Sequence, residues 1–432
     1  DEMDKWFILG LLNSAPYQVA LNSYCGQHKY SGYVNLLPMP ANVSREQKTY
    51  VATIAQRSYE LLENWFKHDQ NTLIFSGTPW LLIDGFFQTL KAHYERYREL
   101  EEKLQNELFT LYCDLNTAVI NVVRAKTRSD LSSIDDVRQQ LESSNLASLG
   151  FPDLIHDLVS YSIAAIMGRW DIQLAKETSI IPIVDPPASY PTTPPAQLAD
   201  SAYGASSAVP IDWDGILVDD PDHTDDIIRR VRGVLEVLWG DRAEAIEQEA
   251  CEILGVKTLR DYFRKPGSGG FWDDHVKRYS KSRRKAPIYW LLQSSRKNYA
   301  LWLYYHRLDK DLYYKALINY VLPKLRLERS KLDALRAQLK EAGVAGREAK
   351  RLEREVEQQE ALMSELQDFH DALKRVAQLN LVPDLNDGVV LNIAPLHELV
   401  PWKEAEKYWK ALLKGEYEWS TISQQLRARG VI

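Results

Sequence analysis

The chain has 432 residues, a formal net charge of -7 and 45% hydrophobic residues, which supports folded cores and excludes a disordered chain. Its three cysteines, Cys25, Cys113 and Cys251, are too far apart for a zinc ligand pair and too few for a disulfide framework, so we expect a reducing compartment and no metal site. No apolar run reaches the roughly 18 residues of a membrane span, and the acidic start is unlike a signal peptide. These features predict a cytoplasmic protein with no membrane partner.

The first part of the chain is predicted to be helical with one extended segment. Residues 6–21 form an apolar run cut by Pro16, which predicts a short buried helix followed by a second element. Residues 31–40 end in prolines and predict a strand or an extended segment. From Ser44 to about residue 126 the apolar spacing is helical, and Ser44 with Gln47 predicts an N-terminal cap.

A stretch rich in Pro, Ala and Ser, residues 183–210, predicts a linker before the second half of the chain. After it, an acidic turn leads into a helix whose apolar residues share one face, and a second helix ends near Gly255. The glycines at 267, 269 and 270 predict a flexible loop and not a phosphate cradle, because no strand precedes them.

The segment from His275 to Leu308 is a local departure from the acidic composition, because it contains nine Lys and Arg and no Asp or Glu. Clustered cations with aromatic residues among them are typical of a surface that binds nucleic acid. The alternative is a solvated basic loop in which Tyr289, Trp290, Trp302 and Tyr305 are core residues. The candidate DNA-binding side chains are those of Lys277, Arg278, Lys281, Arg283, Arg284, Lys285, Arg296 and Lys297.

The last part of the chain is charged and carries a heptad-like pattern between residues 324 and 377. Gly343 and Gly346 interrupt the pattern, which predicts an antiparallel helical hairpin whose two helices bury their seams mainly on each other. The turn signal at 386–388 predicts a small hairpin or an edge strand, and the acidic-aromatic tail predicts a final helix. The expected fold class is therefore mainly α, a multi-domain helical architecture with a few short strands and the hairpin.

Several separate blocks of this sequence resemble a known family. The blocks DLVSYSIAAIMGRWDI, FWDDHVKRYSK, KAPIYWLLQSS and LYYHRLDKD, in this order, resemble the C-terminal half of the PglX-type adenine-specific DNA methyltransferases of BREX phage-defence systems. The methyltransferase of DISARM systems is the near neighbour. The resemblance implies N6-adenine methylation of double-stranded DNA and S-adenosylmethionine as the cofactor of the full-length enzyme.

The catalytic motifs that such an enzyme needs are not found in this chain. No Gly-rich loop follows a first strand, and Asp185-Pro186-Pro187 is followed by Ala188 where the adenine-gripping loop needs an aromatic residue. We therefore expect no catalytic and no cofactor-binding residues in this segment. Because the chain begins at Asp1 and not at Met, we also expect it to be part of a longer polypeptide.

The resemblance and the patterns together predict four regions. Residues 1–43 would be the end of a target-recognition region, residues 44–182 a helical domain, residues 183–210 the linker, and residues 211–432 a C-terminal helical domain that includes the hairpin. Two functions stay open at this point. The chain is either the DNA-clamping portion of a methyltransferase or a non-catalytic scaffold that docks other phage-defence proteins.

Overall fold

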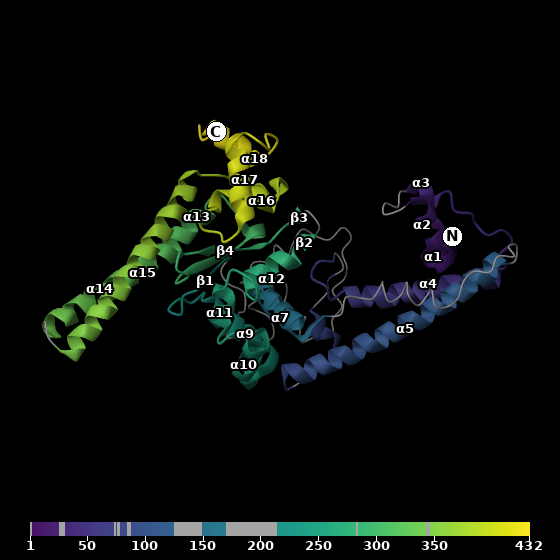
Figure 1. Ribbon diagram of the computed structural model, residues 1–432, viewed down its shortest axis with the longest axis horizontal. Helices are drawn as coiled ribbons and strands as arrows, with labels where there is room; N and C mark the ends of the chain where they lie inside the picture. Colours follow the sequence, from purple (N-terminus) through teal and green to yellow (C-terminus); the bar gives the residue numbers. More distant parts are fainter. Residues whose placement is uncertain are drawn as a thin grey trace. The chain divides into compact units, whose positions relative to one another are not determined.

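The structure is a computed structural model that describes residues 2–25, 31–72, 75, 78–83, 88–124, 149–169, 214–281, 284–342 and 346–432. Helices dominate the described residues (Figure 1), so the predicted mainly α fold class is confirmed. Contacts divide the chain into two units, residues 1–154 and residues 155–432, and the division falls inside helix α7 (Phe151–Ile166). The predicted linker and Asp185-Pro186-Pro187 lie outside the described residues, and the four-region division stays a prediction.

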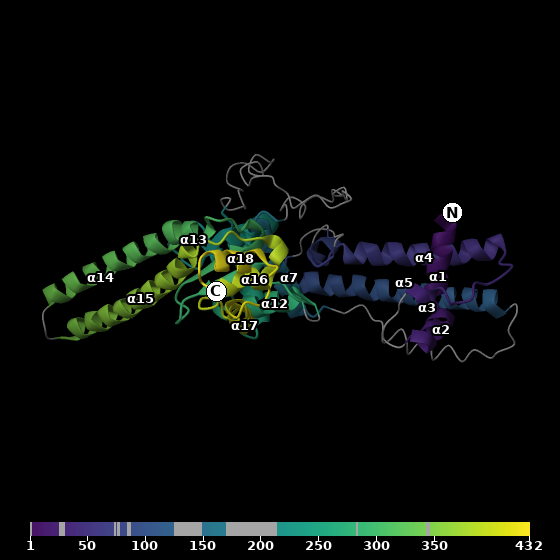
Figure 2. The same cartoon turned by 90° about the horizontal axis from the view of Figure 1, so that it is seen from above.

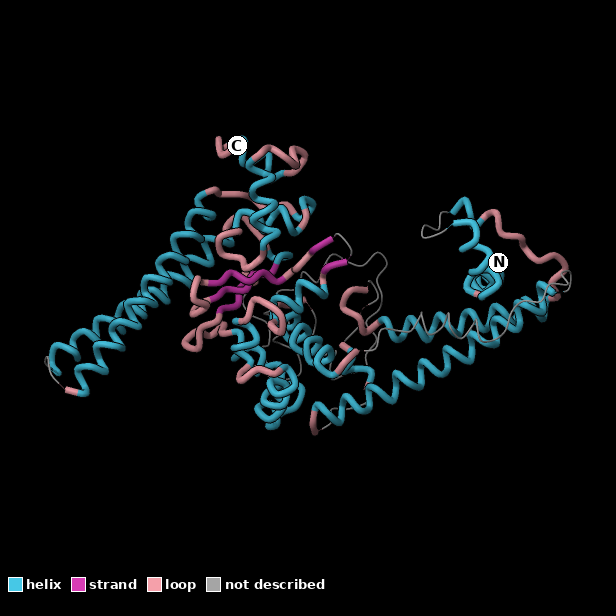
Figure 3. The backbone as a smooth tube through the Cα atoms, viewed as in Figure 1, coloured by secondary structure: helices cyan, strands magenta, loops and turns pink. Residues whose placement is uncertain are grey.

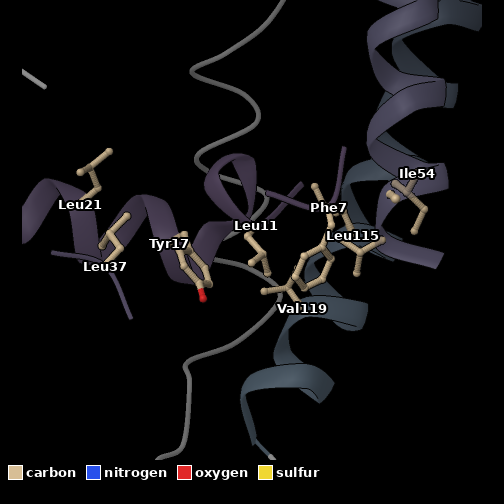
Figure 4. Close-up of a cluster of buried hydrophobic side chains, with 10 residues drawn as sticks. Phe7, Leu11, Tyr17, Leu21, Leu37, Ile54, Leu115 and Val119 are labelled. Atoms are coloured by element: carbon tan, nitrogen blue, oxygen red, sulfur yellow. The ribbon is translucent and has the colours of Figure 1, made fainter. Parts of the chain in front are cut away.

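The first unit is a set of helices packed along two long ones. Its elements are the helices α1 (Glu2–Asn13), α2 (Ala15–Cys25), α3 (Ser31–Val34), α4 (Arg45–Phe66) and α5 (Leu90–Arg124), the 3-10 turn η1 (Pro79–Leu82) and the first residues of α7. Helix α1 approaches α4 so closely that a Cβ atom on Gly10 would lie 2.8 Å from Val51 Cγ1. The buried side chains of Phe7, Leu11, Ile54, Leu115 and Val119 form its core (Figure 4).

Two predictions about this unit have different outcomes. Helix α4 begins with the predicted cap, because Ser44 Oγ accepts from Gln47 N at 3.1 Å and Gln47 Oε1 accepts from Ser44 N at 3.1 Å. The prediction of a strand or an extended segment at residues 31–40 is wrong for most of the segment, since it begins with the short helix α3 and a turn, and residues 38–40 have no regular secondary structure. Leu37 is buried in the helical core, and Tyr17 Oη donates to Pro38 O at 2.7 Å, so side-chain packing and not sheet pairing holds the segment.

The second unit contains a small antiparallel sheet at its centre (Figure 3). Strand β5 (Ala300–Tyr304) lies between β1 (Ile216–Val218) and β4 (Tyr289–Gln293), and β2 (Ser280–Lys281) pairs with β3 (Arg284–Lys285) in a separate two-stranded sheet. The same unit contains the helices α9 (Ile227–Trp239), α10 (Ala243–Leu254), α11 (Leu259–Arg264) and α12 (Phe271–Arg278), with the 3-10 turns η4 (Gly240–Arg242) and η5 (Tyr305–Arg307). Every residue of β1, β4 and β5 is buried, so both faces of this sheet are covered.

The aromatic residues of the basic segment belong to this core. Tyr289 and Trp290 are 0% exposed, Trp302 is 1% exposed and Tyr305 is 4% exposed. Trp302 packs edge-on against Phe271 with ring centroids 5.2 Å apart. These side chains cannot stack on bases, and the alternative that they are core residues is confirmed. Burial of each such ring stabilises the fold by roughly 2–3 kcal/mol.

The predicted helical hairpin is present and projects from the sheet (Figures 1 and 2). It follows α13 (Leu312–Lys315) and the π-helical turn η6 (Ala316–Val321), and consists of α14 (Leu322–Ala342) and α15 (Arg347–Gln378). The expectation that the two helices bury their seams mainly on each other is wrong for the half of α15 nearest the sheet. There Glu365 accepts hydrogen bonds from the β4–β5 turn, and Phe369 lies edge-on to Tyr299 at 5.5 Å between ring centroids.

The end of the chain is a small helical cluster beside the sheet. Its elements are η7 (Leu385–Asp387), α16 (Val389–Ile393), η8 (Ala394–Leu396), α17 (Lys403–Leu413) and α18 (Thr421–Ala428). The predicted final helix is confirmed by α17, but the predicted edge strand after residue 388 is the helix α16. The carboxylate of Asp387 accepts from Thr421 N and Ile422 N at 2.9 Å, so this turn caps α18 and does not connect two strands.

Replacing residues 336–354 by a short Gly-Ser loop should leave the second unit folded, because seam residues such as Leu352 face the partner helix. Deleting all of 325–376 should instead give an insoluble protein, since the deletion removes Glu365 and Phe369, which pack against the β4–β5 turn and Tyr299. Thermal unfolding and solubility measurements on the two deletions check this. A soluble long deletion with an unchanged melting temperature would contradict the role of α15 in the core.

Candidate nucleic-acid interface

The candidate DNA-binding cations fall into three groups once the segment is folded. Lys277 and Arg278 end α12, Lys281 lies in β2 with Arg284 and Lys285 in its partner β3, and Arg296 and Lys297 lie in the turn between β4 and β5. The last two groups are at opposite ends of β4, which at about 3.3 Å per residue separates them by roughly 17 Å. Cations that are close together in the sequence therefore lie in separate places in the folded protein.

The pair at the end of α12 is engaged by carboxylates of the same unit. Lys277 Nζ lies 2.7 Å from Asp273 Oδ2, and its side chain is 64% exposed. Arg278 Nη1 donates to Asp157 Oδ1 at 2.6 Å, and the Asp157 side chain is 3% exposed. An exposed pair such as the first contributes little and can reorganise toward another anion. The second pair holds α7 against α12, so Arg278 has a structural role there.

The histidine that opens the basic segment adds no charge to it. His275 is 2% exposed, and its Nε2 accepts from Ile288 N at 2.9 Å and from Tyr289 N at 3.0 Å. Burial lowers the pKa of His275 well below its ordinary value of 6.5, and the nearby cations Arg169 and Arg278 lower this pKa further. The neutral ring instead fixes the start of β4 against α12.

The β2–β3 pair carries the most concentrated run of predicted cations. The backbone pairs Ser280 with Lys285 and Lys281 with Arg284. Lys285 Nζ forms an ion pair with Glu404 at the start of α17, and its side chain is 40% exposed. Arg283 lies outside the described residues, and the side chains of Lys281 and Arg284 are also outside them.

The turn between β4 and β5 is built around one buried carboxylate. Glu365 of α15 is 3% exposed. Its Oε1 accepts from Ser294 Oγ at 2.5 Å, from Arg296 N at 2.9 Å and from Asn298 N at 3.2 Å, and its Oε2 accepts from Asn298 Nδ2 at 2.7 Å. Four hydrogen bonds from one turn fix the backbone of that turn to the helix. The side chains of Arg296 and Lys297 are both exposed beside it.

Lys297 is held in an unusual backbone conformation within this turn. Its φ is +64°, in the left-handed region that costs a residue with a Cβ atom roughly 1 kcal/mol or more. Hairpin turns that close with a residue in this region usually place Gly or Asn there. Lys297 N donates to Ser294 O at 2.9 Å, so the conformation is part of a closed turn. A lysine at this position is therefore a departure from the usual turn chemistry.

The acidic residues that follow β1 form a second polar cluster with distant basic residues. The sequence indicated the acidic turn but not its partners. Asp219 and Asp226 are 2% and 3% exposed, and Arg260 donates to both, with the Arg260 Nη2–Asp226 Oδ2 bond at 2.9 Å. Arg264 also pairs with Asp219, and Lys324 Nζ lies 2.7 Å from Asp220 Oδ1. The run of acids after β1 was the available signal, but the distant partners could not be assigned without the fold.

A cluster of metal ligands and a membrane-spanning helix are two simple patterns that the described residues could contain. No group of three or more His, Cys, Asp or Glu within them could hold a metal ion. In the same residues, no helix is both long and apolar enough to span a lipid bilayer.

Replacing Glu365 by Ala should lower the free energy of unfolding by about 2–3 kcal/mol, because the donors of the turn lose a charged acceptor. Burial would raise the pKa of Glu365, but hydrogen bonds from Ser294, Asn298 and Arg296 outweigh it, so its pKa is lowered from 4.5. The wild-type stabilisation is therefore present above pH 4.5 and is lost as pH falls through the lowered pKa. Urea unfolding at pH 7 and below pH 4 measures it. A loss under about 0.5 kcal/mol at pH 7 would contradict this role.

Comparison with known proteins adds two relatives, while no family model matches the chain. The chain is 26% identical over 426 residues to the adenine-specific methyltransferase BrxX of Escherichia coli O9:H4 (strain HS), covering 93% of this chain and 33% of that protein. It is 24% identical over 350 residues to the adenine-specific methyltransferase PglX of Lacticaseibacillus casei (strain Zhang), covering 77% of this chain and 25% of that protein. The chain thus spans about a third of the length of the first relative and about a quarter of the length of the second. The resemblance inferred from the sequence blocks is confirmed, and the chain is related to the PglX-type adenine-specific methyltransferases of BREX systems.

Proposed function

We propose that this chain is the C-terminal, DNA-contacting portion of an N6-adenine-specific, S-adenosylmethionine-dependent DNA methyltransferase of a bacterial phage-defence system. The catalytic domain lies elsewhere in the polypeptide. The names of the two relatives support the enzyme class, and the fraction of each relative that aligns supports a partial chain. In this proposal the cations of the basic segment other than Arg278, which is paired with Asp157, contact the phosphates of double-stranded DNA and hold the duplex while the target base is methylated.

The observation that carries the proposal is the rigid turn that presents Arg296 and Lys297. Phosphate contacts determine how a protein is positioned on a duplex, so they are most useful on elements that do not move. Glu365 fixes the backbone of this turn through four hydrogen bonds, and both cations are exposed. Lys297 has a positive φ, a backbone conformation that favours Gly or Asn. A turn selected for stability alone would not need a lysine there.

A second candidate function rests on a different surface. The Trp419 side chain is 65% exposed in the acidic-aromatic tail, and exposed aromatic residues of this kind are enriched in protein interfaces. This feature favours a scaffold that docks other phage-defence proteins. Co-purification of partners that persists at high salt and is abolished by Trp419→Ala would support the scaffold, whereas salt-dependent duplex binding supports the first proposal.

The double variant Arg296→Ala, Lys297→Asn should weaken duplex binding while it leaves folding intact. Each lost phosphate contact should lower the slope of log affinity against log salt by about 0.9, with similar losses on every DNA sequence. Asn tolerates a positive φ, so the melting temperature should stay the same or rise. Fluorescence anisotropy at several salt concentrations measures the slope. The matched control is Lys403→Ala, Lys414→Ala, which removes two exposed charges elsewhere.

The triple variant Arg283→Ala, Arg284→Ala, Lys285→Ala tests the other end of β4 in the same assay. We expect its affinity for duplex DNA to fall on the order of a hundredfold at moderate salt, since each charge-assisted contact contributes about 1 kcal/mol. If this variant and the turn variant both bind with the wild-type slope while folded, the segment is a solvated surface and the DNA-contacting role is wrong.

The isolated chain should neither bind S-adenosylmethionine nor methylate DNA, because the sequence holds no residue set for either step. Isothermal titration calorimetry with the cofactor and a methylation assay on duplex DNA measure these two properties. A dissociation constant in the micromolar range would contradict this prediction and show that the chain contains a cofactor-binding site.

A further inference from the structure

The outer end of the helical hairpin carries a basic surface that lies apart from the segment at 275–308. Four residues near the start of α15 are Lys or Arg, and all four are exposed: Arg347, Lys350, Arg351 and Arg354. Their spacing of three, four and seven residues places them on one face of an α-helix. Ala349, Leu352 and Val356, which are buried, lie on the opposite face toward α14. The basic face therefore points away from the hairpin seam.

The basic face is continuous with the side of α15 that holds the β4–β5 turn. Glu365 follows Arg347 by about five turns at 3.6 residues per turn, so the two lie on the same side of the helix, roughly 27 Å apart. Glu365 binds the turn that presents Arg296 and Lys297. The two cation groups are thus aligned along one side of α15. In a duplex this distance corresponds to about eight base pairs.

Four glutamates share these turns of α15 with the four cations, and their spacing places them on the flanks of the basic face: Glu348, Glu353, Glu355 and Glu357. In the part of the chain that the structure describes, one of these four cations forms an ion pair: Arg351 Nε lies 3.5 Å from Glu355 Oε1, with side chains 66% and 42% exposed. Such an exposed pair contributes little and can be exchanged for another anion. Gln358 and Ala361, between the basic face and Glu365, are uncharged.

We infer that this face of α15 is a second contact surface for the phosphate backbone of the same duplex that the β4–β5 turn contacts. The inference rests on the proposed function and extends it from one turn to a row of six cations. A protein partner would need an apolar core in its interface, and the apolar residues of this stretch of α15 are turned into the seam. A surface with charge and no apolar centre suits a polyanion whose phosphates repeat at regular spacing.

The test is a full-chain variant in which Arg347, Lys350, Arg351 and Arg354 are each replaced by Gln, a residue that favours helices about as well as Lys and Arg. We expect the slope of log affinity against log salt to fall by about two to three units, and the affinity for a 20-base-pair duplex to fall at least tenfold at moderate salt. The matched control replaces four exposed cations elsewhere by Gln, at Arg242, Lys257, Lys403 and Lys414. Circular dichroism checks that helix content is unchanged.

The outcomes separate this inference from the proposed function. A reduced slope in the hairpin variant but not in the control supports the second contact surface. A wild-type slope in the hairpin variant, together with a loss in the Arg296→Ala, Lys297→Asn variant, overturns it and leaves the proposed function in place. If the unmodified chain shows no salt-dependent duplex binding, the proposed function fails first. Unchanged duplex binding with loss of an acidic protein partner would assign the face to that partner and also overturn the inference.

Discussion

Burial of the β1–β5–β4 sheet on both faces is the constraint on which the second unit depends. A sheet of three short strands has little surface of its own, so helices from distant parts of the chain must cover it. Charged side chains that border such a sheet lose water and must find partners within the protein. Asp219, directly after β1, and Asp226, at the N-cap of α9, both pair with Arg260 of α11, and Asp220 pairs with Lys324 of α14. These pairs connect the sheet to helices on two sides of it.

The buried ion pairs determine how these helices are placed against the sheet more than they add to the net stability of the fold. Removing water from two charges costs free energy that their attraction only partly offsets, so the intact pair contributes little. Loss of one partner is different, because it leaves an uncompensated charge inside the protein and typically costs 3–5 kcal/mol. Arg260, shared between Asp219 and Asp226, is the residue whose loss would affect most of this cluster. Glu365 differs, because its partners in the β4–β5 turn are uncharged donors, and its loss would leave unsatisfied hydrogen-bond donors and no uncompensated charge.

The sheet also decides how the basic segment can be used. Its aromatic residues are drawn into the core, so the cations remain at the ends of strands and at helix termini. In the proposed function this division is useful, because phosphate contacts from separate rigid positions define the orientation of a duplex better than one mobile basic loop. The rigid turn at Arg296 and Lys297 and the basic face of α15 would then contact the duplex from the same side of the hairpin. Base-specific contacts would have to come from other residues.

Local patterns in the sequence determined much of the fold. The cap at Ser44, the apolar face of α9 and the break between α14 and α15 each depend on neighbours within a few residues, and each was predicted. The strands predicted at 31–40 and after residue 388 are helices, because Leu37 packs into a helical core and Asp387 caps α18. Both outcomes depend on residues far along the chain.

The candidate site shows the same division between local and distant information. Composition alone indicated the cations of 275–308, because a run without Asp or Glu is visible in the sequence. Only the tertiary structure decided that Arg278 is paired with Asp157, that Trp302 is core, and that Glu365, some seventy residues further on, fixes the turn at Lys297. Charge and periodicity are properties of a segment, whereas burial and ion pairing are properties of the contacts that folding creates. For this reason the sequence determined which side chains could bind a polyanion, and the fold decided which of them remain available.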